Sequence, residues 1–153
     1  MSELAPQPDR PGVTIDIPVR WGDMDALGHV NNIVYFQYCE SARIAYFDAL
    51  DLDACRQKPG DGPGLVAANL NFRKQVRYPA TLRVTTNVTA ISRRSITFSF
   101  VLRDKTNGSP VADGTSVAVW VDYELGQALA IPEPLRRGIA RLEQNPKLGG
   151  VPA

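Results

Sequence analysis

The chain has 153 residues, 44% hydrophobic and 22% charged, a composition that is ordinary for one globular domain. Its 17 basic and 16 acidic residues leave a net charge of +1, so charge gives no reason to expect a nucleic-acid or membrane-surface partner. No apolar run approaches the roughly 20 residues that span a bilayer, and the N-terminus lacks the apolar core of a signal peptide, so we expect a cytoplasmic protein. The two cysteines lie outside any CxxC spacing, which also favours a reducing compartment.

The first 19 residues divide into a tail and a strand. Residues 1–12 hold three prolines and a glycine, so we expect a flexible tail there. Residues 13–19, VTIDIPV, place an apolar residue at every second position, which predicts a strand with one apolar face. Pro18 falls on the other face and has no N–H to donate, so this strand is expected at a sheet edge or a bulge.

Polar and titratable side chains are concentrated in residues 22–32, GDMDALGHVNN. This stretch holds two aspartates, the only histidine of the chain, two glycines and two asparagines. In the aromatic-rich segment that follows, apolar residues recur at steps of three and four, and this spacing predicts a helix that ends near Leu50. Asn31 or Asn32 is suited to cap its first turn. Two apolar stripes cover most of the helix, so we expect burial on several sides. One of these stripes consists of Ile33, Phe36, Ile44 and Phe47.

The second half of the chain predicts a run of strands. A flexible connector is expected over residues 53–64, DACRQKPGDGPG, because glycine and proline are frequent there. Alternating apolar positions then predict four strands, and short polar connections favour antiparallel hairpins between them. Residues 132–143 predict a short amphipathic helix, and residues from about 146 to 153 a second flexible tail. The four strands are expected at 68–73, 82–90, 96–102 and 117–121. One early helix followed by hairpins indicates an α+β domain with a sheet curled around the helix.

Residues 19–43, VRWGDMDALGHVNNIVYFQYCESAR, resemble the N-terminal signature of hotdog-fold acyl-CoA thioesterases of the 4-hydroxybenzoyl-CoA thioesterase type. The similar features are a D-x-D-x-x-G-x-V pattern and an aromatic-rich helix that ends in E-x-A-R. A YPA turn at 78–80 and the segment AIPEPLRR at 130–137 continue the resemblance more weakly. The resemblance implies one hotdog domain over residues 1–153, in which a five-stranded antiparallel sheet wraps a long central helix.

The resemblance also implies a site. The second aspartate of the pattern, Asp25, is expected to act as nucleophile or general base. The backbone N–H near Asn32, at the positive end of the helix dipole, is expected to polarise the thioester carbonyl. Gly28 would allow a close approach of the loop to the substrate. The residues expected to bind substrate are Gly28, His29, Val30, Asn31 and Tyr35. No cofactor or metal is expected, because one histidine and scattered acids make no ligand set.

Several of these residues also have simpler interpretations. A D-x-D before a helix is often turn and cap chemistry, and Asp23 is expected to be structural because an offset of two residues points it away from Asp25. Glu40 is expected to pair with Arg43 on the helix. Cys39 is most simply a core residue. Four cations are expected either to meet the phosphates of coenzyme A or to be solvated surface charges. These are Lys74, Arg77, Arg93 and Arg94.

Three functions remain open on the sequence. The first is hydrolysis of an acyl-CoA thioester, the second a hydratase or dehydratase on the same fold, and the third a non-catalytic acyl-CoA-binding module. The acyl group, and the choice between coenzyme A and an acyl carrier protein, are not fixed by the sequence. Open sheet edges favour a homodimer or homotetramer. The resemblance implies a shared site, with residues 69–73 facing the Asp25 loop of the partner.

Overall fold

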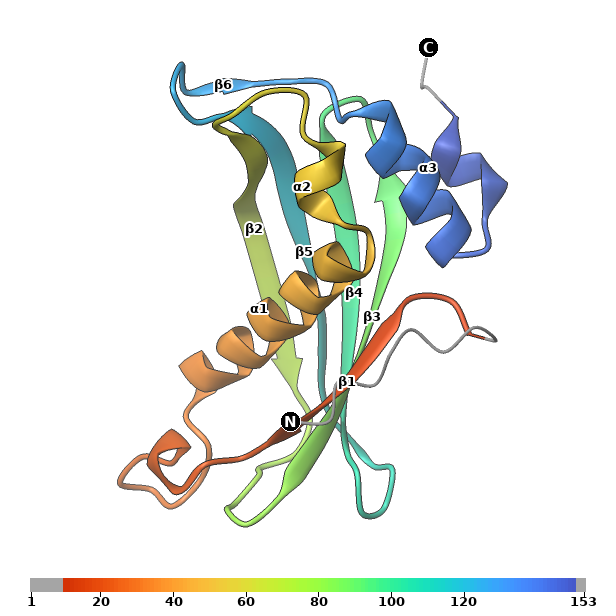
Figure 1. The fold of residues 1–153 in the computed structure, drawn as a ribbon. Coiled ribbons are helices and arrows are strands. Elements are labelled where there is room, and N and C mark those ends of the chain that lie inside the picture. Colours follow the sequence, from red (N-terminus) through yellow and green to blue (C-terminus); the bar gives the residue numbers. More distant parts are fainter. Residues whose placement is uncertain (1–9, 151–153) are drawn as a thin grey trace.

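A curled antiparallel sheet with a long helix across its concave face forms the body of the protein in the computed structural model, which describes residues 10–150 (Figure 1). The strands lie in the order β1-β3-β4-β5-β2, and a short strand β6 pairs with β5. The strands are β1 Val13–Pro18, β2 Asp61–Phe72, β3 Thr81–Ile91, β4 Ser95–Asp104, β5 Pro110–Asp122 and β6 Gln127–Ala128. The predicted hotdog fold is confirmed, and β1, which carries Pro18, lies at one edge of the sheet.

Alternation of side chains explains why the sheet has a core face. In β4 the residues Ile96, Phe98, Phe100 and Leu102 are buried, whereas the residues between them are half-buried on the opposite face. The same alternation continues in β5, where Ala118 and Trp120 face the core.

The prediction of a flexible connector at residues 53–64 is wrong for most of that stretch. A short helix α2, Leu52–Cys55, begins it, and β2 starts already at Asp61. Asp61 is fully buried and accepts hydrogen bonds from the Trp120 indole at 3.0 Å and from the Gln57 N–H at 3.2 Å. The contact with Trp120, which is distant in sequence, and the local contact with Gln57 fix a segment whose glycine and proline content alone predicts flexibility.

The long helix α1, Asn32–Ala49, packs one face against the sheet. Tyr46 and Phe47 on that face contact Phe98 of β4 with ring centroids 5.5 Å apart. The buried residues of the helix are Tyr35, Tyr38, Cys39, Ala42, Tyr46 and Phe47. The expected burial on several sides is not seen in the single chain, because Ile33, Phe36 and Ile44 are exposed by 64%, 37% and 53%.

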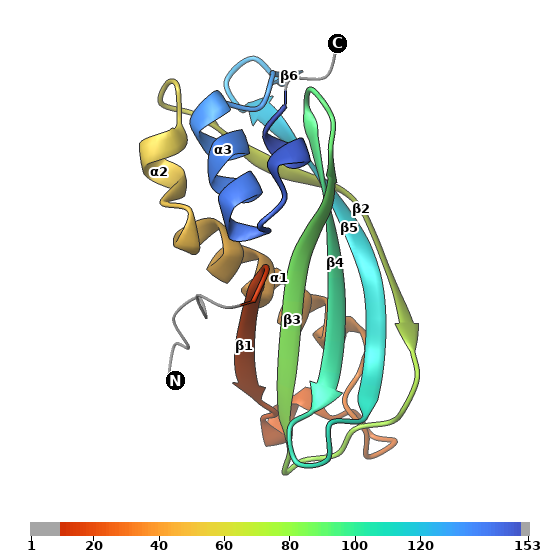
Figure 2. The same cartoon turned by 90° about the vertical axis from the view of Figure 1, so that its right-hand side faces the viewer.

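The C-terminal part of the described chain packs beside the upper ends of β3 and β4 (Figure 2). Helix α3, Glu133–Leu142, agrees with the predicted amphipathic helix. The prediction of a flexible tail from about residue 146 is wrong for its first part. Pro146–Gly149 form a 3-10 helix, η2, and Leu148 packs against the core. At the other end the Gly12 N–H donates to Leu142 O at 3.1 Å, so the described part of the first tail is tied to α3. Residues 1–9 and 151–153 of the expected tails lie outside the described residues.

Within residues 10–150, no helix combines the length and apolar character needed to cross a bilayer.

Candidate active site

The loop between β1 and α1 is held in a tight, defined turn. A short 3-10 helix, Trp21–Asp23, begins it, and Met24 and Val30 form an antiparallel bridge across it. The Gly28 N–H donates to Asp25 O at 3.0 Å, and Gly28 has a φ of 80°, a conformation that favours glycine. Val30 N–H donates to Val76 O at 2.8 Å, which fastens the loop to the segment between β2 and β3. The backbone of this loop therefore has a fixed position at the N-terminus of α1.

Asp23 is a buried anchor of this loop. Its carboxylate accepts hydrogen bonds from the Tyr38 hydroxyl at 2.7 Å and from the Arg20 N–H at 2.9 Å. Burial alone would raise the pKa of Asp23, but these two donors and the Arg20 guanidinium together lower it below its ordinary value. Burial and the hydrogen bond to Asp23 raise the pKa of the Tyr38 hydroxyl. Asp23 is thus structural, as its offset from Asp25 predicts.

Asp25 is exposed, and both of its carboxylate oxygens are oriented by neighbours. The Leu27 N–H donates to Oδ1 at 2.9 Å, and Asn31 Nδ2 donates to Oδ2 at 3.3 Å. Asn31 is also the N-cap of α1, because its Oδ1 accepts from the Ile33 N–H at 3.0 Å. One side chain therefore joins the carboxylate to the start of the helix.

The Asn32 N–H in the first turn of α1 is left without a partner among the described residues. Ile33 N–H is bonded to the Asn31 side chain, and Val34 N–H donates to Asn31 O at 3.0 Å. The Asn32 N–H has no hydrogen-bond acceptor among residues 10–150. It lies at the positive end of the helix dipole, where a developing negative charge is stabilised.

Asp25 and Asn32 line the same open pocket of about 370 Å³. Three other predicted site residues also line it, namely His29, Val30 and Tyr35. Gly28 and Asn31 do not line the pocket: Gly28 shapes the turn, and Asn31 holds Asp25 and caps the helix. The remaining lining residues are Leu27, Phe72, Arg73, Lys74 and Gln75.

Leu27 and Gln75 are the pocket residues that the sequence did not indicate, whereas Phe72 belongs to the stretch 69–73 that the resemblance implied for a site. Phe72 ends β2 and packs edge-on against Tyr35 with ring centroids 5.2 Å apart, so the strand brings an apolar wall to the helix. Burial raises the pKa of the Tyr35 hydroxyl. Leu27 is 81% exposed. The signal that could have indicated it is a leucine inside the largely polar stretch of residues 22–32.

The four candidate phosphate-binding cations lie in two separate places. Lys74 lines the pocket, and Arg77 follows in the same exposed segment. Arg93 and Arg94 occupy the turn between β3 and β4, beside α3 and at the opposite end of the sheet from the start of α1 (Figure 1). The carbonyl of Arg93 accepts from Arg136 and from the Ile131 N–H, so this turn is part of the packing against α3.

The polar residues further along α1 have no role in this pocket. Arg43 forms no ion pair with Glu40 within residues 10–150, and burial lowers the pKa of Arg43. Cys39 is buried, and its burial raises the pKa of the thiol to about 12, which leaves it protonated and unreactive. Among residues 10–150, no cluster of three or more His, Cys, Asp or Glu side chains is arranged to hold a metal ion.

Comparison with known proteins places the chain in a family. Residues 19–139 match the model of the thioesterase-like superfamily, a span that includes the Asp25 loop and all of α1. The chain belongs to this superfamily. The thioesterase class predicted from the sequence is therefore confirmed.

Three similar proteins show how far the similarity extends. The chain is 28% identical over 131 residues to the long-chain acyl-CoA thioesterase FadM of Escherichia coli strain K12, which covers 86% of this chain and 97% of that protein. It is 29% identical over 110 residues to the chloroplastic acyl-acyl carrier protein thioesterase ATL2 of Arabidopsis thaliana. That match covers 71% of this chain and 58% of that protein. The structure of the PA2801 protein of Pseudomonas aeruginosa is 34% identical with a TM-score of 0.75, and the match covers 83% of this chain and 97% of that chain.

Proposed function

We propose that the protein hydrolyses an acyl-CoA thioester to the free acid and coenzyme A in the pocket at the start of α1. The observation that carries this proposal is the presence of an oriented Asp25 carboxylate and an unpaired Asn32 N–H in one pocket. Thioester hydrolysis needs both a group that attacks or activates water and a donor for the carbonyl oxygen.

In the proposed reaction the thioester carbonyl oxygen accepts a hydrogen bond from the Asn32 N–H. Loss of one such donor typically costs about 10²–10³ in kcat. Asp25 can act in two ways. As a nucleophile it adds to the carbonyl carbon, the C–S bond breaks with release of the coenzyme A thiolate, and water then hydrolyses the mixed anhydride. As a base it takes a proton from a water molecule, whose oxygen adds to the carbon before the same C–S bond breaks.

The remaining pocket residues support binding and orientation. Asn31 and the Leu27 N–H hold the carboxylate, and Gly28 sets the turn that brings these groups together. His29, Val30 and Tyr35 form the wall next to the reacting carbonyl, together with Phe72. Lys74 at the pocket is placed to attract a coenzyme A phosphate.

The test is a release assay with a panel of acyl-CoA thioesters and a thiol reagent. Cys39 and Cys55 are both buried, so the protein itself should contribute little background signal. Thiol release at many turnovers per enzyme supports hydrolysis. Altered acyl chains without thiol release would instead indicate a hydratase or dehydratase, and saturable binding without any turnover would indicate a binding module.

We also propose that the protein works as a homodimer or a larger homo-oligomer formed through β2. This strand is an open sheet edge of 12 residues, and open edges pair readily. Exposed apolar side chains border it: Leu65, Val66 and Phe72 on the strand, and Ile33, Phe36 and Ile44 on α1. Contiguous exposed apolar surface of this kind marks an interface. Whether residues 69–73 also reach the partner's Asp25 loop stays a prediction.

Light scattering of the wild type and of the Val66→Lys variant tests the assembly. Lysine on an edge strand opposes pairing, so the variant should shift toward monomer, whereas Thr97→Lys on the outer face of the central strand β4 should not. A wild type that is monomeric at micromolar concentration with full activity would exclude a site shared between subunits.

A further inference from the structure

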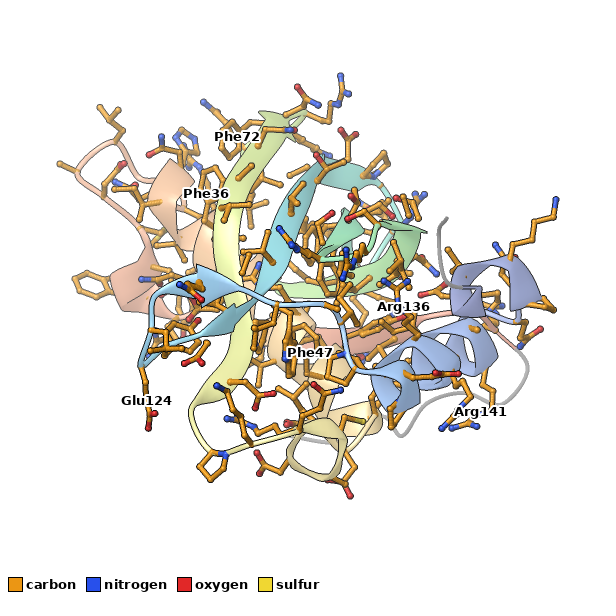
Figure 3. All side chains as sticks on the ribbon, turned by 90° about the horizontal axis from the view of Figure 1, so that it is seen from above. Phe36, Phe47, Phe72, Glu124, Arg136 and Arg141 are labelled. Carbon is orange, nitrogen blue, oxygen red and sulfur yellow. The ribbon has the colours of Figure 1, made fainter. Side chains whose placement is uncertain are left out.

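Three hydrogen bonds fasten the loop that carries Asp25 to the segment of residues 73–80, between β2 and β3. Along that segment they follow one another at every second residue. The three are Val19 N–H to Ala80 O at 2.8 Å, Tyr78 N–H to Met24 Sδ at 3.5 Å, and Val30 N–H to Val76 O at 2.8 Å. Seen from above, the loop lies on the opposite side of the molecule from α3, which carries the labelled Arg136 and Arg141 (Figure 3).

Met24 supplies the middle contact, and it is the only one of the three in which a side chain accepts. The backbone of Met24 forms the bridge with Val30, and Asp25 is the next residue in the sequence. A displacement of Met24 therefore also moves the residue that carries the catalytic carboxylate. Misplacing a reacting group by about 1 Å can lower a rate about a hundredfold.

Met24 is also the least buried of the three sulfur-containing residues within 10–150. It is half-buried, and its neighbour Asp25 is exposed, whereas Cys39 and Cys55 are buried. Oxidation of a cysteine proceeds through its thiolate, and burial raises the pKa of the Cys39 thiol to about 12. A thioether needs no deprotonation before it is oxidised. A small hydroperoxide therefore finds its most accessible sulfur at the middle of the catalytic loop.

Oxidation changes the contact between Met24 and Tyr78. A thioether is apolar, whereas a methionine sulfoxide is polar. The sulfur and the Tyr78 nitrogen are 3.5 Å apart, and this separation leaves no space for an oxygen atom between them. Val30 and Val76 of the adjacent contact are buried, and a polar oxygen beside buried apolar side chains is unfavourable unless a donor meets it. The sulfoxide should therefore separate the loop from the 73–80 segment.

We propose that Met24 is a modification site, at which oxidation by a hydroperoxide releases the Asp25 loop and stops hydrolysis. The Met24 sulfur forms a bond to one peroxide oxygen while the O–O bond breaks. The sulfur loses two electrons, and hydrogen peroxide is reduced to water. Two thiols acting through a methionine sulfoxide reductase reverse the step, forming a disulfide and water. The effect on activity rests on the proposed hydrolysis at Asp25, whereas the oxidation and the release of the loop do not.

The experiment treats the protein with hydrogen peroxide and follows three quantities. Peptide mass spectrometry measures the gain of one oxygen atom at Met24, separately from Met1, the other methionine of the sequence. Hydrogen exchange measures protection of the Tyr78 N–H, and thiol release from an acyl-CoA measures kcat. We expect oxidation at Met24, faster exchange at Tyr78 and a loss of kcat between about tenfold and a hundredfold. Methionine sulfoxide reductases A and B with dithiothreitol should restore all three.

Two variants at the same position separate oxidation from loss of the sulfur. Met24→Leu keeps an apolar side chain and removes the oxidisable atom, so peroxide should leave its own kcat and its own exchange unchanged. Met24→Gln also removes the sulfur but places a polar group there, as the sulfoxide does. Without any peroxide it should have a lower kcat and faster exchange at Tyr78 than Met24→Leu. Melting temperatures well above the assay temperature would show that both variants are folded.

The outcomes separate this inference from the proposed function. Oxidation of Met24 that leaves kcat and the exchange of Tyr78 unchanged would overturn the proposal. An equal loss of kcat in Met24→Leu would also overturn it, because the oxidised atom would then lie elsewhere, as would a Met24 that stays unmodified while Met1 is oxidised. If the untreated protein hydrolyses no acyl-CoA, the proposed function fails by itself, and the mass and exchange measurements still decide whether oxidation of Met24 releases the loop.

Discussion

Replacing Tyr38 by phenylalanine should destabilise the protein through the loop that carries Asp25. The Tyr38 hydroxyl donates to the buried Asp23 carboxylate at 2.7 Å, and the Asp23 carbonyl in turn accepts from the Asn31 N–H at 3.0 Å. A hydrogen bond to a charged group contributes about 1.5–3 kcal/mol. In the variant Asp23 keeps its hydrogen bond from the Arg20 N–H at 2.9 Å. We therefore expect the free energy of unfolding to fall by about 2 kcal/mol.

The loss should depend on pH in a defined direction. Because the pKa of Asp23 is lowered in the folded protein, its carboxylate stabilises the fold above the pKa of the unfolded chain, and this contribution disappears as pH falls through the folded-state pKa. Tyr38→Phe removes one cause of the lowered pKa. The difference between wild type and variant should therefore be largest at pH 7 and should shrink below about pH 4.

Urea unfolding at equal protein concentration, at pH 7 and at pH 3.5, measures this difference. At pH 7 we also expect a lower melting temperature by roughly 4–8 °C, from about 2–4 °C per kcal/mol for a domain of this size. Tyr35→Phe is the control, because Tyr35 is equally buried on the same helix without a carboxylate partner. A difference in free energy of unfolding below about 0.5 kcal/mol at pH 7, or a difference that grows on acidification, would refute the stabilising role of the Tyr38–Asp23 hydrogen bond.

Three further predictions concern other parts of the molecule. Glu143→Ala should destabilise the fold by about 3 kcal/mol in urea unfolding, because it leaves the Tyr46 hydroxyl and the Val88 N–H buried without their acceptor. Lys74→Ala should raise KM for an acyl-CoA with little change in kcat, and should have no such effect on the N-acetylcysteamine thioester, which lacks the phosphates. Cys39 should not react with a thiol reagent at pH 8 in the native protein and should react at once in guanidinium, which stopped-flow absorbance would show.

The parts of the fold that the sequence predicted are those in which local pattern and tertiary packing agree. The alternation in β4 and the Asn31 cap of α1 belong to this class, because period-two burial and first-turn capping are local properties. The start of β2 could not be predicted, since Asp61 is held by Trp120, which is distant in sequence. The helical turn at Pro146–Gly149 was missed for a similar reason, as its position depends on contact with α3.

The site divides in the same way. Asp25, His29 and Asn32 are near one another in sequence, so their meeting in one pocket follows from a single loop. Phe72 lies in the stretch 69–73, which was expected to face the Asp25 loop of a partner, whereas it lines a pocket with Asp25 of its own chain. That contact depends on the sheet order, in which β2 is the edge strand, and no local pattern specifies that order. The apolar periodicity of α1 predicts that its second stripe is covered, but not what covers it. The stripe is exposed in the single chain because the sheet of the same chain does not reach it.

The central claim is that the Asp25 carboxylate performs or activates the attack on the thioester, and kcat of Asp25→Asn measures it most directly. Asparagine keeps the shape and can still occupy the turn, but it cannot attack as a carboxylate or accept a proton from water. We predict that the folded variant loses more than 90% of wild-type kcat, whereas His29→Ala loses far less. A tenfold loss corresponds to about 1.4 kcal/mol in the barrier. An Asp25→Asn enzyme that keeps more than about a tenth of wild-type kcat, or an equal loss in His29→Ala, would contradict the account.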